Sequence, residues 1–186
     1  VGAIELGQGS DTVFSQMVSE ITTIPESRLT MVSKQDTDIS PYDSGAYASR
    51  QTYVSGGAVK KAAKLLKYKL LDYAARIYGL SPDELDLQNE MIVSKKEEKA
   101  ICSIAQVCCH MNFINDLKTE TTQITAEATY TADNICFAYG ASFVDLEVDI
   151  PLGRVNIHKI YAIHDSGRIL NPQLAAAQIH GGVAMG

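Results

Sequence analysis

The chain has 186 residues, of which 46% are hydrophobic and 20% are charged, and its formal net charge is −6. A chain of this length buries about 70% of its unfolded surface, so it can form a core without disulfides or metal ions. The excess of acidic residues argues against a general binder of nucleic acid. No apolar run approaches the ~20 residues of a membrane helix. We therefore expect a globular protein with neither nucleic acid nor membrane among its partners.

The N-terminal segment is predicted to run strand, turn, helix and strand. Residues 1–6 suit a short strand, and Gly7-Gln8-Gly9 follows as a turn. From Ser10, apolar residues recur at helical spacing until Pro25 ends the helix. Apolar and β-branched residues predict a second strand at 29–33.

A long loop and a long helix come next. Residues 36–50 are rich in Asp, Ser, Pro and Gly, which predicts a loop, and loops of this length are usually functional. An amphipathic helix is expected at 50–78, ended by Gly79. We interpret its lysine run as a solvated helix face, with a basic patch as the alternative.

The middle of the chain mixes short elements. Residues 81–84 suit a turn with proline at its first position, and 85–93 suit a strand pair around Gln88-Asn89. An amphipathic helix is expected at 97–110, with apolar residues inward. Alternation of apolar and polar residues predicts a strand at 121–132 with one side in water.

The C-terminal third is predicted to be a hairpin and a helix. Strands are expected at 137–150 and 155–163, joined by the turn Pro151-Leu152-Gly153-Arg154. Asn171-Pro172 then opens a helix that runs to Gly186.

Strands and helices mix without strict alternation, which places the chain in the α+β class. The acidic stretch 36–43 and the polar stretch 112–121 are the candidate joints. We expect two lobes, at residues 1–111 and 121–186.

The four cysteines carry no metal or disulfide motif. They are Cys102, Cys108, Cys109 and Cys136, without a C-x-x-C pair. We interpret them as reduced cysteines of a cytoplasmic protein, with a zinc or redox site as the alternative.

Gly7-Gln8-Gly9 is the first candidate site. A glycine turn between a strand and a helix exposes main-chain N–H groups to an anion. However, Thr12 stands where a dinucleotide-binding turn has its third glycine, and the P-loop lysine is absent. A purely structural turn is the alternative.

Gly45-Ala46-Tyr47-Ala48-Ser49-Arg50 is the second candidate site. Its small residues let the backbone approach a bulky ligand, and Ser49 with nearby N–H groups would hold a phosphate or polar ring. Arg50 would add a charge-assisted contact. In the alternative, Ser49 only caps the helix and Arg50 pairs with a nearby acid.

The third candidate combines Gln178 with Gly181 and Gly182 on the last helix. Each glycine inside a helix costs about 1 kcal/mol relative to alanine, so something gains from a close approach there. Helix–helix packing is the alternative.

His164-Asp165 is a weak candidate for a metal pair or a catalytic dyad. We expect Asp165 instead to cap a turn or to pair with Arg168. The other histidines are isolated, and we predict structural roles for them: His110, His158 and His180. No catalytic arrangement can be assembled.

The candidate segments occur in the order and spacing of a known family. In the first half the matching residues are Gly7-Gln8-Gly9-Ser10-Asp11-Thr12, Asp36-Thr37-Asp38, Ser40-Pro41, Gly45-Ala46-Tyr47-Ala48-Ser49-Arg50 and Gly56-x-Ala58. In the second half they are Val144-x-x-Glu147-Val148-Asp149, Gly153-x-Val155, His164-Asp165-x-Gly167-Arg168-x-Leu170-Asn171-Pro172 and Gln178-x-x-Gly181-Gly182. The chain resembles the C-terminal molybdopterin-binding region of the large subunit in the xanthine dehydrogenase family of molybdenum hydroxylases. It is most similar to the 4-hydroxybenzoyl-CoA reductase-like and bacterial purine hydroxylase-like branches.

The resemblance implies a molybdopterin-binding fold whose pterin dithiolene, rather than a protein side chain, holds the molybdenum. The cofactor-binding residues that it implies are Gly7, Gln8, Gly9, Gly45, Ala46, Tyr47, Ala48, Ser49, Gln178, Gly181 and Gly182. The last three would bind the pterin or its phosphate from another direction.

The resemblance assigns no catalytic residue to this chain. The family's general base is a glutamate in a later motif, so neither Glu127 nor Glu147 takes that role. His180 stands where the family commonly has an acid. Because the chain starts with Val1 rather than methionine and Gly186 falls inside a small-residue stretch, we expect a fragment. Since it would hold only part of the cofactor pocket and not the family's glutamate, we expect it to be inactive alone.

The implied enzyme hydroxylates a purine, aldehyde or related aromatic, or reduces an aromatic thioester. Its implied partners are the remainder of the large subunit and subunits or domains with iron–sulfur clusters and FAD, in an oligomer. The cofactor is expected in its cytosine dinucleotide form. The alternative is a non-enzymatic domain that binds an anion or nucleotide, or that serves assembly.

Overall fold

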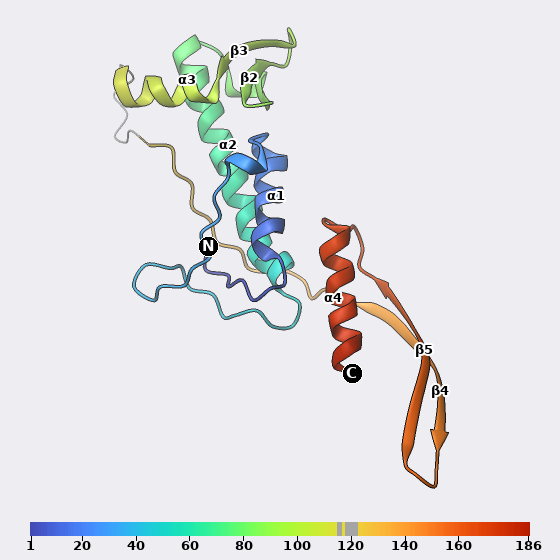
Figure 1. The fold of residues 1–186 in the computed structure, drawn as a ribbon. Helices are drawn as coiled ribbons and strands as arrows, with labels where there is room; N and C mark the ends of the chain where they lie inside the picture. Colours follow the sequence, from blue (N-terminus) through green and yellow to red (C-terminus); the bar gives the residue numbers. More distant parts are fainter. Residues whose placement is uncertain (115–116, 118–122) are drawn as a thin grey trace. The chain divides into compact units, whose positions relative to one another are not determined.

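The computed structural model describes residues 1–114, 117 and 123–186. Contacts divide the chain into two compact units, Val1–Ala132 and Asp133–Gly186 (Figure 1). The division therefore falls beyond the joint that we expected at 112–121.

The first helix, α1, spans Ser10–Thr22 as predicted. Gly9 precedes it at φ 83°, and Thr23 ends it at φ 59°, where its N–H bonds to the carbonyl of Ser19. The predicted strands at 1–6 and 29–33 are wrong, because neither segment forms a ladder. A hydrogen bond of 3.2 Å from the Val1 ammonium to the Val32 carbonyl joins them instead.

The long helix α2 spans Gly56–Tyr78, and a π-helical turn at Gln51–Ser55 leads into it. Gly79 ends α2 in the left-handed conformation (φ 65°), which confirms its predicted role. Residues 36–50 contain turns and coil, as expected. Helix α1 lies beside α2 (Figure 1).

The lysine run on α2 is only partly a solvated face. The Lys61 and Lys69 ammonium groups donate to the carbonyls of Thr129 (3.4 Å) and Thr125 (2.7 Å). Lys67 pairs with Asp86 at 2.6 Å. Part of the predicted strand 121–132 lies outside the described residues, and 123–132 forms no strand. The carbonyls of Thr125 and Thr129 thus bond to α2 instead of to a neighbouring strand.

Three short antiparallel strands form a sheet in the order β1–β2–β3. They span Leu85–Gln88, Met91–Ser94 and Lys99–Ser103. The predicted strand pair is confirmed, but the helix expected at 97–110 is wrong over its first half. Strand β3 occupies most of that half, helix α3 spans only Ile104–Cys109, and a π-helical turn at His110–Ile114 continues it. The Ser103 side chain accepts from the backbone N–H of Gln106 in a capping box, which fixes the start of α3.

The core of this unit lies between α2, the small sheet and α3. Its buried members are Leu70, Leu71, Tyr73, Ala74, Ala75, Leu85, Leu87, Ile92, Cys102, Val107 and Met111. Cys102 is thus a core residue, and burial raises the pKa of its thiol. All four cysteines are free.

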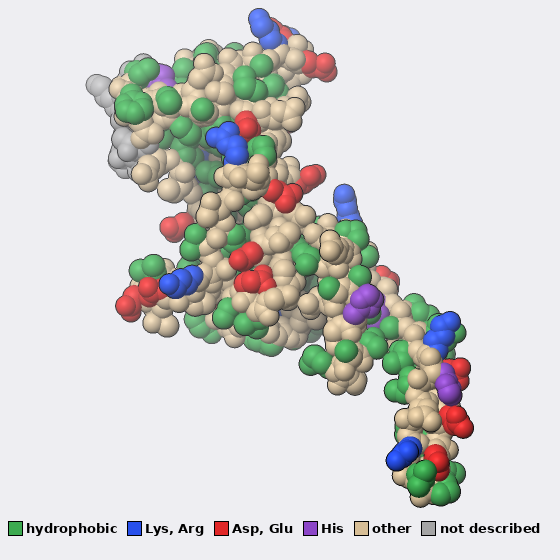
Figure 2. All heavy atoms as spheres, viewed as in Figure 1, with side chains coloured by type: hydrophobic (Ala, Val, Ile, Leu, Met, Phe, Trp, Pro, Cys, Tyr) green, Lys and Arg blue, Asp and Glu red, His purple; other side chains and the backbone are tan. Residues whose placement is uncertain are grey.

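The second unit consists of a hairpin and a helix, both as predicted. Strands β4 (Tyr139–Asp149) and β5 (Arg154–Asp165) pair antiparallel, and Gly153 at φ 61° serves the turn between them. Helix α4 spans Pro172–Met185, capped by the Asn171 side chain. Hydrophobic and charged side chains are interspersed along the hairpin (Figure 2). Helices and antiparallel sheets together confirm the α+β class.

No helix in the described ranges has both the length and the apolar character that crossing a membrane requires.

Candidate functional site

The amide groups of the first candidate turn are already bonded to a carboxylate of the same chain. Glu5 Oε1 accepts from the N–H groups of Gly7 (2.7 Å) and Gly9 (3.0 Å). Glu5 Oε2 accepts from the Ser10 hydroxyl and the Asp11 N–H, both at 3.0 Å. The predicted anion at this helix start is therefore supplied internally.

The electrostatics of Glu5 agree with this geometry. Burial raises the pKa of its carboxyl group, but the bonds from Asp11, Gly9, Ser10 and Gly7 outweigh that effect. The pKa falls to about 2, from 4.5 for an ordinary glutamate. Glu5 is thus an anion at every pH at which the protein would work.

Gln8 folds back onto the segment before the turn. Its Oε1 accepts from the Leu6 N–H at 2.6 Å, and its Nε2 donates to the Ile4 carbonyl at 2.8 Å. Gln51 Nε2 donates to the same carbonyl at 3.3 Å. Through Ile4, the structure brings the first candidate turn next to the end of the second.

In the second candidate segment, Asp43 organises the loop. The Gly45 N–H (2.8 Å) and Arg50 Nη1 (2.7 Å) both donate to its Oδ1, and the Ser55 hydroxyl donates to Oδ2 at 3.0 Å. Arg50 also donates to the Gly45 carbonyl at 2.8 Å. The alternative in which Arg50 pairs with a nearby acid is therefore confirmed.

The pKa of Asp43 lies below its ordinary value. Burial raises it, but the bonds from Gly45, Arg50 and Ser55, together with the Arg50 charge, outweigh burial. The Asp43 and Arg50 side chains are only 12% and 18% exposed, so this pair is shielded from water. The loop thus closes around a charged pair.

The backbone of the outer part of the loop has a constrained conformation. Ala48 (φ 50°) and Ser49 (φ 53°) are both left-handed, and the Arg50 N–H bonds to the Tyr47 carbonyl at 3.2 Å. Two consecutive left-handed residues cost conformational free energy when neither is glycine, and functional loops often contain such strained backbone. Tyr47, Ala48 and Ser49 are exposed, and no cap bond from Ser49 occurs at the described start of α2.

Two buried oxygens near these segments lack a hydrogen-bond partner among the described residues. They are Asp11 Oδ1 and Gln51 Oε1. Native proteins rarely leave such atoms unpaired. Asp11 follows the glycine turn and Gln51 follows the loop at 45–50, so each unpaired oxygen stands beside a candidate segment.

The third candidate lies on one face of α4. Gln178, Gly181 and Gly182 stand at i, i+3 and i+4, which is the spacing of neighbours on a helix surface. A Cβ on either glycine would meet nothing within 4 Å inside this unit. Helix–helix packing within the unit therefore does not account for these glycines, and their open face suits the close approach of a flat group.

Asp165 accepts from the Gly167 N–H at 3.0 Å, which confirms that it caps the turn. His158 lies 3.7 Å from Glu147 on the hairpin. Within the ranges that the structure describes, no three His, Cys, Asp or Glu side chains gather as a metal site.

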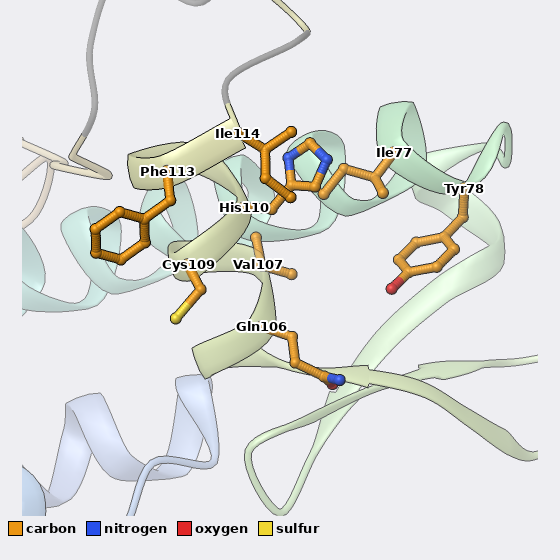
Figure 3. Close-up of a pocket in the computed structure, with 8 residues that line it drawn as sticks. All are labelled: Ile77, Tyr78, Gln106, Val107, Cys109, His110, Phe113 and Ile114. Atoms are coloured by element: carbon orange, nitrogen blue, oxygen red, sulfur yellow. The ribbon is translucent and has the colours of Figure 1, made fainter.

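A separate cavity of about 310 Å³ is lined by none of the residues predicted to bind the cofactor (Figure 3). It lies between the end of α2 and the helical segment at 104–114. The lining residues are Ile77, Tyr78, Gln106, Val107, Cys109, His110, Phe113 and Ile114. His110 Nδ1 lies 3.2 Å from the Tyr73 hydroxyl. The lining of this cavity is almost wholly apolar, which does not suit a polar cofactor.

Sequence reasoning missed four residues of the site region: Glu5, Asp43, Gln51 and Ser55. A signal existed for Glu5, because a glutamate two residues before a glycine turn can reach the amides at the next helix start. The contact between Asp43 and Ser55 spans twelve residues, and only the folded loop makes it visible.

Solved structures of known enzymes share this fold. The structure superposes on CO dehydrogenase from Oligotropha carboxidovorans with a TM-score of 0.82 and 26% identity, over 97% of this chain and 22% of that chain. Quinoline 2-oxidoreductase from Pseudomonas putida 86 gives a TM-score of 0.83 at 22% identity, over 98% of this chain and 23% of that one, which shows the fold alone. The fold is that of a domain in these two larger enzyme chains.

The family described as molybdopterin cofactor-binding domain matches residues 1–186, and the chain belongs to it. The xanthine dehydrogenase molybdenum-binding subunit of Escherichia coli O157:H7 is 42% identical over all of this chain and 24% of its own length. The carbon monoxide dehydrogenase large chain of Hydrogenophaga pseudoflava is 27% identical over all of this chain and 23% of its own length. These findings confirm the resemblance to the xanthine dehydrogenase family. The chain spans about a quarter of the length of these relatives.

Proposed function

We propose that this chain holds the molybdopterin cofactor in a molybdenum-dependent oxidoreductase of the xanthine dehydrogenase type. The family match over residues 1–186 is the observation that carries the proposal. Because the relatives are about four times longer, the complete enzyme includes polypeptide outside this chain. We expect the general base there.

The residues of the chain fit such a cofactor. Gln178 offers an amide beside the open surface of Gly181 and Gly182, which suits a flat pterin. The exposed turn at Ala48 and Ser49 offers main-chain groups without bulky side chains. Gln51 Oε1 offers an acceptor that has no partner in the described chain.

When bound, the cofactor supplies two-electron redox chemistry at molybdenum, and the protein supplies binding and orientation. In this chain, the Asp43–Arg50 pair fixes the loop that presents residues 45–49. Glu5 fixes the turn that presents Gly7 and Gln8. The chain thus contributes walls of the cofactor site rather than reacting groups.

The complete enzyme is proposed to hydroxylate a purine, an aldehyde or a related aromatic, or to reduce an aromatic thioester. The similarity to a xanthine dehydrogenase subunit favours a purine. We further propose the cytosine dinucleotide form of molybdopterin, a cytoplasmic location, and an oligomer with iron–sulfur and FAD subunits. The leaning toward the 4-hydroxybenzoyl-CoA reductase-like branch stays a prediction.

The alternative, a module for free anions or nucleotides, is not favoured. Its best motif was the Gly7-Gln8-Gly9 turn, whose amides are bonded to Glu5. The family match points to a cofactor domain instead.

The proposal is tested by measuring molybdenum and pterin in the complete protein and in its Gln178→Ala variant. We expect the variant to lose most of its pterin. Gln173→Ala is the matched control, because Gln173 is an exposed glutamine in the first turn of the same helix. Full pterin in Gln178→Ala, or an equal loss in Gln173→Ala, would contradict the assignment.

A further inference from the structure

We propose that Glu5 is a positioning residue: a built-in anion that occupies the amide cluster at the start of α1 and fixes the glycine turn for the cofactor. Its consequence for the cofactor rests on the proposed function. Cofactor contacts at this turn then run through its outward side, and not through the amides of Gly7, Gly9 and Asp11.

The hydrogen-bond geometry carries this inference. A carboxylate has about four lone-pair sites, two on each oxygen. Each Glu5 oxygen accepts from two donors, at 2.7 and 3.0 Å on Oε1 and twice at 3.0 Å on Oε2. All four acceptor sites of the Glu5 carboxylate are therefore used. Each of the four donors is already bonded to Glu5, so none is available to a phosphate.

The backbone of the turn depends on the same bonds. Gly7 (φ 97°) and Gly9 (φ 83°) are left-handed, and Gly9 gives α1 no side-chain cap. Without such a cap, the first N–H groups of a helix need another acceptor. Glu5 is that acceptor for the Asp11 N–H, and its negative charge interacts favourably with the positive end of the α1 dipole.

The outward side of the turn is open. A Cβ on Gly7 would meet nothing within 4 Å, and Gly7 is exposed. The positive φ of Gly7 explains why this residue is a glycine. The open space beside it leaves room for a ring to lie against the turn. An external anion on the amides would have to displace Glu5 and approach a second carboxylate, Asp11.

The test removes the internal anion and offers a free one. Glu5→Ala leaves the amide donors unpaired beside a small space, and Glu5→Gln fills that space with a group that also carries N–H donors. The unfolding temperature of the full chain is measured with formate or acetate and with chloride at equal ionic strength. Glu20→Ala is the control, because it makes the same charge change at the exposed other end of α1.

We expect both Glu5 variants to unfold about 5 °C or more below the wild type in chloride. Formate or acetate should restore Glu5→Ala toward the wild type and leave Glu5→Gln and Glu20→Ala unchanged. Should Glu5→Ala fail to fold in chloride, it is purified in formate, and failure there too would overturn the proposal. Wild-type stability of Glu5→Ala, or an equal response of all variants to formate, would also overturn it.

Pterin content separates this proposal from the proposed function. In the complete protein, Glu5→Ala should lose several-fold in pterin, and formate supplied during loading should restore it. Full pterin in Glu5→Ala without formate would refute a role of Glu5 in the cofactor site. If the wild type itself contained no pterin while formate still stabilised Glu5→Ala, the proposed function would fail and the filled amide cluster would stand.

Discussion

Gln8 and Gln51 meet at one acceptor, the carbonyl oxygen of Ile4, to which their Nε2 atoms donate at 2.8 Å and 3.3 Å. The two glutamines are far apart in the sequence: Gln8 lies within the first candidate segment, and Gln51 directly follows the second. Their shared acceptor links the glycine turn to the end of the loop before α2.

The two glutamines should contribute differently to stability. Gln51→Met removes a long hydrogen bond together with an unpaired buried oxygen, so we expect it to change the free energy of unfolding by less than about 1 kcal/mol. Gln8→Met removes bonds to Leu6, Ile4 and Ser10 and should cost about 1–2 kcal/mol. Urea denaturation of both variants measures the difference. A larger cost at Gln51 would show that its amide has partners in solution.

The Asp43–Arg50 pair should be strongly coupled. Arg50→Met leaves the shielded Asp43 carboxylate without its cation and should cost about 2–3 kcal/mol. In a double-mutant cycle with Asp43→Asn, we expect a coupling energy above about 1 kcal/mol. The exposed Arg28–Glu90 pair is the control and should couple by less than that. Equal coupling in the two pairs would refute the shielding of Asp43.

The low pKa of Glu5 predicts a particular acid dependence. The folded-state pKa of about 2 lies below the ordinary 4.5, so the contribution of Glu5 is fully present above pH 4.5 and is lost as pH falls toward 2. Chemical denaturation across this range should show a steeper loss for the wild type than for Glu5→Gln. Glu20→Gln should keep the wild-type slope. Parallel curves for wild type and Glu5→Gln would mean that the Glu5 pKa is not depressed.

Gly57 should be required for packing against Tyr130. A Cβ on Gly57 would lie 2.5 Å from Tyr130 Cδ1, whereas one on Gly56 would lie 2.9 Å from the flexible end of Met17. We expect Gly57→Ala to destabilise by about 1–2 kcal/mol, despite the better helix propensity of alanine, and Gly56→Ala to cost less.

The Tyr130→Ala background checks the cause. There, Gly57→Ala should become neutral or stabilising by up to about 1 kcal/mol, because only the propensity gain is left. A persistent cost in that background would place the clash elsewhere. Thermal unfolding of the four variants gives these values.

Elements with local signals were predictable from the sequence. Asn171-Pro172 marked the start of α4, Gly79 the end of α2, and Gly153 the turn of the β4–β5 hairpin. In each case, the residue type itself sets the backbone conformation or supplies the cap. Neighbouring parts of the chain were not needed.

Elements decided by distant partners were not predictable. Residues 123–132 alternate like a strand, but lysines of α2 bond to their carbonyls. The segment at 97–110 has helical spacing, yet its first half pairs with β2, where Cys102 lies opposite Ile92. Segments 1–6 and 29–33 have strand composition without a ladder to join.

The candidate site divides in the same way. Residue types marked the glycine turn, the loop at 45–50 and the face of Gln178 as candidate segments, and their cofactor contacts stay a prediction. The carboxylates that fix these segments, Glu5 and Asp43, have no motif of their own. Their roles depend on the directions of amide groups, which only the folded backbone defines.

The pterin and molybdenum content of the complete protein and of its Gly181→Ala variant shows whether this chain holds molybdopterin. We expect stoichiometric cofactor in the wild type. In Gly181→Ala we expect a large loss of cofactor although the helix itself gains up to about 1 kcal/mol, because a methyl group would then stand on the open face of α4. A wild type without molybdenum and pterin, or a Gly181→Ala variant with full cofactor, would contradict the proposed function.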